Sequence, residues 1–147
     1  TGKQTDVSPF EKITEAMYDS GFQITGVWPV RTEAANEKYE TVRIMIVFRC
    51  RSGDEQITRR GWINALKREL PEELEATFTD EIEADDRMLV AIGKGLSVFS
   101  RYKKIMNADG SPMTIQDALG IIRQESDDFL QSHLQSEDAG AIDIKEE

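Results

Sequence analysis

The chain has 147 residues, of which 39% are apolar and 31% charged, and its net charge is −10. This length is typical of one globular domain, and no apolar run approaches the roughly 20 residues that a membrane-spanning helix requires. A single cysteine, Cys50, and a single histidine, His133, exclude an internal disulfide and a zinc-ligand spacing, so we expect a cytoplasmic protein that binds no membrane and no metal.

The first predicted element is a helix. Ser8 can cap its N-terminus, Pro9 suits the first helical position, and Glu11 can complete the capping box. Hydrophobic residues then recur at helical spacing, so one side should face a core. Gly21 is suited to end the helix, since glycine readily adopts the backbone conformation that follows a C-terminus.

Two strands are expected next, over residues 22–30 and 41–51. Alternation in the first strand places Phe22 and Ile24 on one face, joined by Trp28 if the pattern continues. The second strand alternates most clearly, and Cys50 lies on its apolar face, where a small apolar role is the default. About ten residues join the strands, so we predict an antiparallel pair.

A second helix is predicted to begin after Thr58, which can cap it. Its apolar stripe includes Trp62 and Leu66, and its opposite side is basic. Pro71 should open a separate helical piece, because proline removes a helical hydrogen bond. The basic residues of this region are Arg59, Arg60, Lys67 and Arg68.

The stretch 92–104 allows two interpretations. Gly93 and Gly95 flank Lys94, and a cluster of cations follows that includes Arg101, Lys103 and Lys104. Each glycine costs a helix about 1 kcal/mol relative to alanine, which suggests a helix end or close packing by another segment. The alternative is a basic loop that contacts a phosphate or a partner.

The C-terminal third is predicted to contain a turn, a helix and a tail. Residues 107–110, Asn-Ala-Asp-Gly, favour a turn, which allows a short hairpin near 102–113, and Thr114 can cap a following helix. Residues 105–147 hold most of the negative charge, ten acids against two cations. We expect a single α+β domain over residues 1–134, with four to five helices, and a disordered acidic tail over 135–147.

An acidic cluster precedes the third predicted helix. Carboxylates near one another could bind a cation, but this run lacks the ordered spacing and the mid-loop glycine of a calcium loop. Negative charge is also favourable at a helix N-terminus, which is the simpler role. The cluster comprises Asp80, Glu81, Glu83, Asp85 and Asp86.

Three blocks of sequence occur in an order that resembles a known family. They are GFQITGVWPVRTE (21–33), TRRGWINALKRELPEEL (58–74) and AIGKGLSVFSRYKKIMNADGSPMTIQDAL (91–119). The resemblance is to the C-terminal region of the large bacterial adenine-specific DNA methylases that carry an N-terminal domain of unknown function, and it spans roughly residues 10–130.

The resemblance implies that residues 8–51 match the end of a Rossmann-like methyltransferase sheet, where a helix precedes an antiparallel strand pair. It implies S-adenosylmethionine as the cofactor of a longer parent protein. This chain lacks the Asp/Asn-Pro-Pro-aromatic catalytic motif and the glycine-rich cofactor turn, and Lys94 replaces a proline that is common in the family. We therefore expect no catalytic or cofactor-binding residue in this chain, which should be inactive alone.

Two functions follow as hypotheses. The chain could be a non-catalytic part or relative of an adenine-specific DNA methyltransferase that contacts DNA or braces the catalytic domain. It could instead be a protein-interaction module with no role on DNA, whose exposed strand edge or helical face docks a partner, either another protein or a second copy of the chain. For contacts with DNA phosphates, the candidate residues are Arg59, Arg60, Lys94, Arg101 and Lys104.

Overall fold

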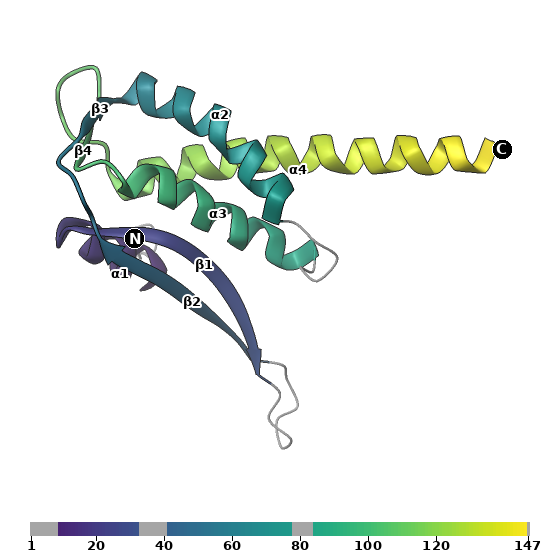
Figure 1. Ribbon diagram of the computed structural model, residues 1–147, viewed down its shortest axis with the longest axis horizontal. Coiled ribbons are helices and arrows are strands. Elements are labelled where there is room, and N and C mark those ends of the chain that lie inside the picture. The colour runs from purple at the N-terminus through teal and green to yellow at the C-terminus, as the bar shows by residue number, and fades with distance from the viewer. Residues whose placement is uncertain (1–8, 33–40, 78–83, 147) are drawn as a thin grey trace, which may run out of the picture.

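The computed structural model describes residues 9–32, 41–77 and 84–146, which form an α+β arrangement (Figure 1). The predicted class is confirmed, with an antiparallel strand pair packed against helices. The elements in chain order are α1 (Pro9–Asp19), β1 (Phe22–Thr32), β2 (Thr41–Cys50), β3 (Gln56–Thr58), α2 (Arg59–Thr77), α3 (Ala84–Ser100), β4 (Lys104–Met106) and α4 (Ile115–Glu146).

Helix α1 leads directly into the β1–β2 hairpin. Gly21 follows the helix with a φ of 93°, as predicted for a residue that ends a helix, while the proposed cap Ser8 lies outside the described residues. The strands pair antiparallel from Phe22↔Cys50 to Thr32↔Thr41, with a bulge between Ile24 and Gly26. Arg51 N donates to Gly21 O at 2.9 Å and extends the pairing by one bond.

The bulge changes which side chains of β1 face the core. It inserts one extra residue, Thr25, so the alternation reverses beyond that point. Ile24 and Val27 are therefore both buried, whereas Trp28 is half-buried. The prediction that Ile24 and Trp28 lie on the same face of the strand is therefore wrong.

Helix α3 lies between the hairpin and the other long helices, with β1 on one side and α2 and α4 on the other (Figure 1). Its two glycines allow this close packing. A Cβ atom at Gly93 would lie 2.6 Å from the backbone nitrogen of Val27, and one at Gly95 would overlap the side chain of Ile122. Close packing by another segment, one of the predicted reasons for these glycines, is therefore the correct one.

Helix α2 is continuous through Pro71, so the predicted break into two pieces is wrong. Leu70 and Leu74 on either side of the proline are fully buried, and their packing outweighs the missing helical hydrogen bond. Thr58 caps the helix as predicted, because its Oγ1 accepts a hydrogen bond from Gly61 N at 3.1 Å. In the described part of the chain the protein has four helices.

Strands β3 and β4 form a short parallel pair, Gln56↔Lys104 to Thr58↔Met106, that was not predicted. The hairpin considered near 102–113 is reduced to one antiparallel bridge between Met106 and Pro112. Asn107 N donates to Ser111 O at 2.8 Å across the turn. Residues 107–110 thus form the predicted turn, but β4 pairs mainly with β3.

Helix α4 begins after the predicted cap, since Thr114 Oγ1 accepts a hydrogen bond from Asp117 N at 3.1 Å. Its backbone stays helical to Glu146, and its C-terminal part extends beyond the other elements (Figure 1). The structure therefore differs from the disordered tail expected from residue 135. This segment contains several residue types with favourable helix propensity, namely glutamine, glutamate, alanine and lysine. Hydrophobic periodicity, on which the prediction was based, does not report this propensity.

Candidate functional site

Lys94 does not lie in a basic loop. It belongs to α3, its side chain is 19% exposed, and its Nζ lies 3.6 Å from Glu73 Oε2. The same ammonium lies 5.4 Å from the ring centroid of Trp28, within the range of a cation–π interaction. Lys94 therefore links α3 to α2 and β1 and is not available to a phosphate without breaking these contacts.

Arg101 is also paired inside the protein. Its two terminal nitrogens donate to Glu69 at 3.2 and 2.7 Å, the two-bond geometry that makes arginine–carboxylate pairs strong. Partial burial alone would lower the pKa of Arg101, but hydrogen bonding to Glu69 and the charge of that carboxylate outweigh it and raise the pKa. This pair joins the end of α3 to α2.

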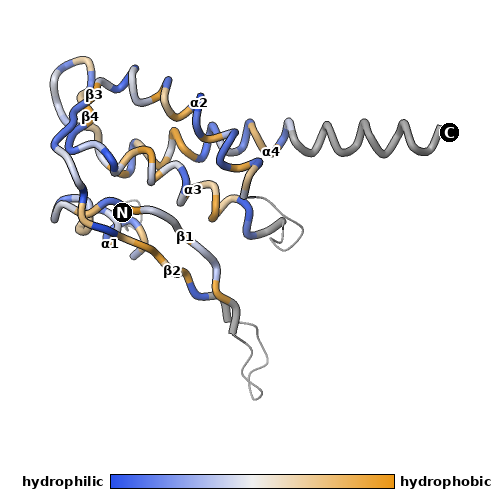
Figure 2. The backbone as a smooth tube through the Cα atoms, viewed as in Figure 1, coloured by the Kyte–Doolittle hydropathy of each residue, from blue (hydrophilic) through white to orange (hydrophobic). Residues whose placement is uncertain are grey.

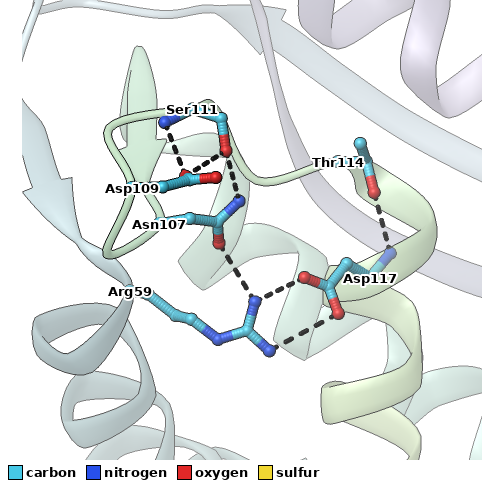
Figure 3. A network of polar contacts seen from close by, with 6 residues as sticks. All are labelled: Arg59, Asn107, Asp109, Ser111, Thr114 and Asp117. Carbon is cyan, nitrogen blue, oxygen red and sulfur yellow. Dashed lines mark hydrogen bonds and ion pairs between the residues drawn. The ribbon is translucent and has the colours of Figure 1, made fainter.

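Arg59 anchors the 107–111 turn (Figure 3). Its Nη1 donates to Asn107 Oδ1 at 3.0 Å and to the carboxylate of Asp117 at the start of α4. Asn107 in turn donates to Ser111 Oγ at 3.2 Å, and Ser111 donates to Asp109. The guanidinium charge of Arg59 is thus balanced by Asp117, and the residue holds α2, the turn and α4 together.

Arg60 and Lys104 differ from the other three candidates. Arg60 is exposed in the first turn of α2, and Lys104 is half-buried in β4. Neither makes an ion pair within residues 9–32, 41–77 and 84–146. Of the five cations predicted to contact phosphates, three are therefore paired with carboxylates, and only Arg60 and Lys104 have no such partner in the described part of the chain.

Arg60 borders a cavity of about 610 Å³ between α2 and the turn that follows β4. Lys104 borders a different cavity of about 410 Å³, between α1 and the start of α4. The structure brings Arg59 and Arg60 to the first cavity and leaves Lys94, Arg101 and Lys104 outside its lining. The five cations do not all line one site.

The hairpin presents a feature that the sequence reasoning missed. Ile44 and Met45 are each 48% exposed, and Val47 is 39% exposed, so apolar side chains reach solvent along β2. Figure 2 colours part of β2 as hydrophobic. The signal was the uninterrupted apolar run 44–48, Ile-Met-Ile-Val-Phe. Such runs are typical of strands covered on both faces, whereas α3 packs chiefly on β1.

The edge of the hairpin is also open in the described part of the chain, where the sheet contains only β1 and β2. Exposed Arg43 and Arg49 flank the apolar run, and Cys50 is exposed rather than packed. Cys50 pairs with Phe22 at the end of the hairpin. We call the exposed residues Ile44, Met45 and Val47 the hairpin patch; Met45 and Val47 lie on one face of β2 and Ile44 on the other.

Polar contacts of Arg51 and Tyr18 join the hairpin to the helical part of the protein. Arg51 donates from Nε to Ser100 O at 2.9 Å and from Nη2 to Tyr18 O at 3.1 Å, and its guanidinium lies 4.8 Å from the centroid of the Tyr18 ring. The hydroxyl of Tyr18 lies 2.8 Å from Lys103 O and 3.0 Å from Tyr102 O. The hairpin patch is therefore held in a defined orientation relative to α3.

Within the described ranges, no three His, Cys, Asp or Glu side chains come together in a way that could hold a metal ion. Asp80, Glu81 and Glu83 of the predicted acidic cluster lie outside those ranges, as does the side chain of Asp85, whereas Asp86 is buried in α3. None of the helices in that part of the chain is both long and apolar enough to cross a bilayer. Comparison with known proteins finds no matching family model, no matching curated protein and no matching solved structure.

Proposed function

We propose that this chain is a non-catalytic C-terminal part, or a relative, of an adenine-specific DNA methyltransferase, and that it braces the catalytic domain through its β1–β2 hairpin. The hairpin patch is the observation that carries this proposal. Its side chains are apolar and exposed, and Arg51 at the end of the hairpin is bonded to Ser100 O. An exposed apolar strand beside an open edge suits the addition of a further strand.

The sequence resemblance supports the same partner. A helix followed by an antiparallel strand pair is the order expected at the end of a methyltransferase sheet, and α1, β1 and β2 have this order. In this proposal S-adenosylmethionine and the target adenine are held by the catalytic domain, whose motifs this chain lacks. The contribution of this chain is to cover an edge of that domain.

The ion pairs favour bracing over DNA contact. Lys94, Arg101 and Arg59 each have a carboxylate partner, and phosphate binding would require these pairs to break. A DNA role would therefore depend on Arg60 and Lys104.

The DNA role is tested by filter binding over a salt series. Arg60→Gln and Lys104→Gln would each lower the salt exponent of the affinity by about one, while Lys94→Gln would leave it unchanged. No affinity for DNA, or an affinity independent of salt, would reject the DNA contact and leave the bracing role.

The bracing role is tested with the polypeptide encoded immediately upstream. We expect it to contain a glycine-rich cofactor turn and the Pro-Pro motif, and to bind the purified chain in a calorimetric titration. Met45→Glu and Val47→Glu should each weaken this binding at least tenfold, because they place a charge in an apolar contact. Ala76→Glu, at an exposed position of α2, is the matched control and should bind as the wild type does.

Tight binding of S-adenosylmethionine by this chain alone would contradict the proposal. Equal affinity of the Met45→Glu and Ala76→Glu variants for the catalytic domain would also contradict it.

The second candidate is a self-associating interaction module, which the same patch would serve. Light scattering separates the two functions. A dimer that Met45→Glu converts to a monomer, with no binding to the upstream polypeptide, would favour self-association. A monomer at all accessible concentrations would exclude it.

A further inference from the structure

The cavity between α2 and the turn after β4 has no residue of the hairpin in its described lining and plays no part in the bracing role proposed above. Its volume of about 610 Å³ falls within the range of about 300–1,000 Å³ that is usual for small-molecule sites. One wall is the first two turns of α2, with Arg60, Ile63 and Asn64, and the other is the turn, with Met106, Ala108 and Gly110.

The turn wall is preformed. Asn107 is held between Arg59 and Ser111, and Ser111 donates to Asp109 Oδ1 from both its backbone nitrogen, at 3.0 Å, and its hydroxyl (Figure 3). Gly110 completes the turn with a φ of 86° and donates from its nitrogen to Asn107 O at 2.9 Å. A wall ordered in this way requires little further ordering when a ligand binds.

The opposite wall is equally fixed. Thr58 caps the first turn of α2 at 3.1 Å, and the next turn is anchored by Trp62, whose side chain is fully buried. Arg60 and Asn64 lie one turn apart on the exposed side of this helix. The helix therefore holds a cation and an amide beside the apolar surface of Ile63.

The charge of this cavity is positive. Arg59 lies at the cavity but is balanced by Asp117, whereas Arg60 has no ion pair with any residue in the described part of the chain. None of the described residues that line the cavity is a carboxylate. Ile63, Met106 and Ala108 make the remaining surface largely apolar, so the cavity combines an apolar floor with one unbalanced cation and neutral amide groups.

We infer that this cavity binds a small organic anion, with a compact apolar body against Ile63, Met106 and Ala108 and one acidic group against Arg60. A bicyclic aromatic carboxylate has this chemistry, and 1-naphthoate is therefore a suitable probe. The acidic group gains a charge-assisted hydrogen bond from the guanidinium, and the ring replaces water on the apolar wall.

The inference is tested by titrating 1-naphthoate into the ¹⁵N-labelled full chain and following backbone amide shifts by NMR. We expect saturable shifts in residues 58–64 and 106–110. Neutral 1-naphthamide should bind about tenfold more weakly than 1-naphthoate, since its amide oxygen carries no charge and the hydrogen bond from Arg60 is weaker. Inorganic phosphate alone should bind weakly, because it lacks the apolar body.

Three variants sharpen the test. Arg60→Gln should weaken 1-naphthoate binding about tenfold, and Asn64→Trp should abolish it by filling the cavity from an exposed helical position. Arg68→Gln is the matched control, because Arg68 is a highly exposed arginine of the same helix outside the cavity lining, and it should leave the affinity unchanged. The amide spectrum of each variant reports whether its fold is retained.

Shifts confined to residues 43–48 would overturn the inference, because they would place the probe on the hairpin patch. Equal affinities of the Arg60→Gln and Arg68→Gln variants would overturn it as well. So would a duplex oligonucleotide that shifts the amides of 58–64 and 106–110 when 1-naphthoate does not.

Discussion

The backbone nitrogen of Ile24 donates a hydrogen bond of 2.8 Å to the hydroxyl of Ser100, so a side chain of α3 takes the place of a strand partner next to the bulge in β1. The same hydroxyl donates to Leu96 O at 2.7 Å, and Ser100 is fully buried. This contact joins the hairpin to the helical part next to the bulge in β1.

Ser100→Ala is expected to lower the free energy of unfolding by about 1–3 kcal/mol, because it leaves the buried amide of Ile24 without an acceptor. Ser126→Ala is the matched control. Ser126 is also fully buried in a helix, but its hydroxyl has no hydrogen-bond partner in the described part of the chain, so its removal should be neutral or stabilising. Urea denaturation of the two variants measures the difference, and equal losses would refute this role of Ser100.

Gly93→Ala is expected to destabilise the protein by more than 1 kcal/mol, despite the better helix propensity of alanine. The new Cβ would meet the backbone of Val27, which cannot move without displacing β1. Gly120→Ala, in α4, has no atom within 4 Å of the new Cβ and should stabilise by up to about 1 kcal/mol. Thermal unfolding of both variants gives the comparison. If both stabilised the protein, α3 and β1 would not be in close contact.

Tyr18 should make the stability sensitive to alkaline pH. Burial raises the pKa of Tyr18 above its ordinary value of 10.0, although the charge of Arg51 opposes this shift. Since the folded state has the higher pKa, the contribution of neutral Tyr18 is complete below pH 10 and is lost as the pH rises through the folded pKa. The difference in unfolding free energy between the wild type and Tyr18→Phe should therefore shrink above pH 10. A difference independent of pH up to 11 would contradict this linkage.

Asp109 should titrate at an unusually low pH. The hydroxyl and then the backbone nitrogen of Ser111 donate to its carboxylate and hold the pKa of Asp109 below its ordinary value of 3.8. Any stabilisation of the turn is thus present above that value and is lost as the pH falls through the folded pKa. Side-chain ¹³C NMR titration should show that Ser111→Ala raises the pKa of Asp109 towards 3.8. An identical Asp109 titration in both proteins would mean that the bonds to Ser111 are absent in solution.

The features that the sequence predicted correctly are those determined by nearby residues. Thr58 and Thr114 cap α2 and α4 because a cap requires only an oxygen three residues before a free amide. The β1–β2 pairing follows from alternation and a short connection, and Gly21 ends α1 through its own backbone freedom. These local rules were enough to predict the α+β class.

Tertiary structure decided which cations remain available. Arg101 forms an ion pair with Glu69 of α2, and Arg59 forms one with Asp117 of α4. The partners are far apart in the sequence, and no local sequence pattern predicts that they meet. The parallel pairing of β3 with β4 and the contact of Gly93 with Val27 have the same origin. An ion pair or a close packing contact depends on positions in space, which the fold sets only when all its elements have packed together. The lack of an ion pair at Arg60 among the described residues and the exposure of the hairpin patch are therefore properties of the assembled protein, whereas the chemistry of their residues was present in the sequence.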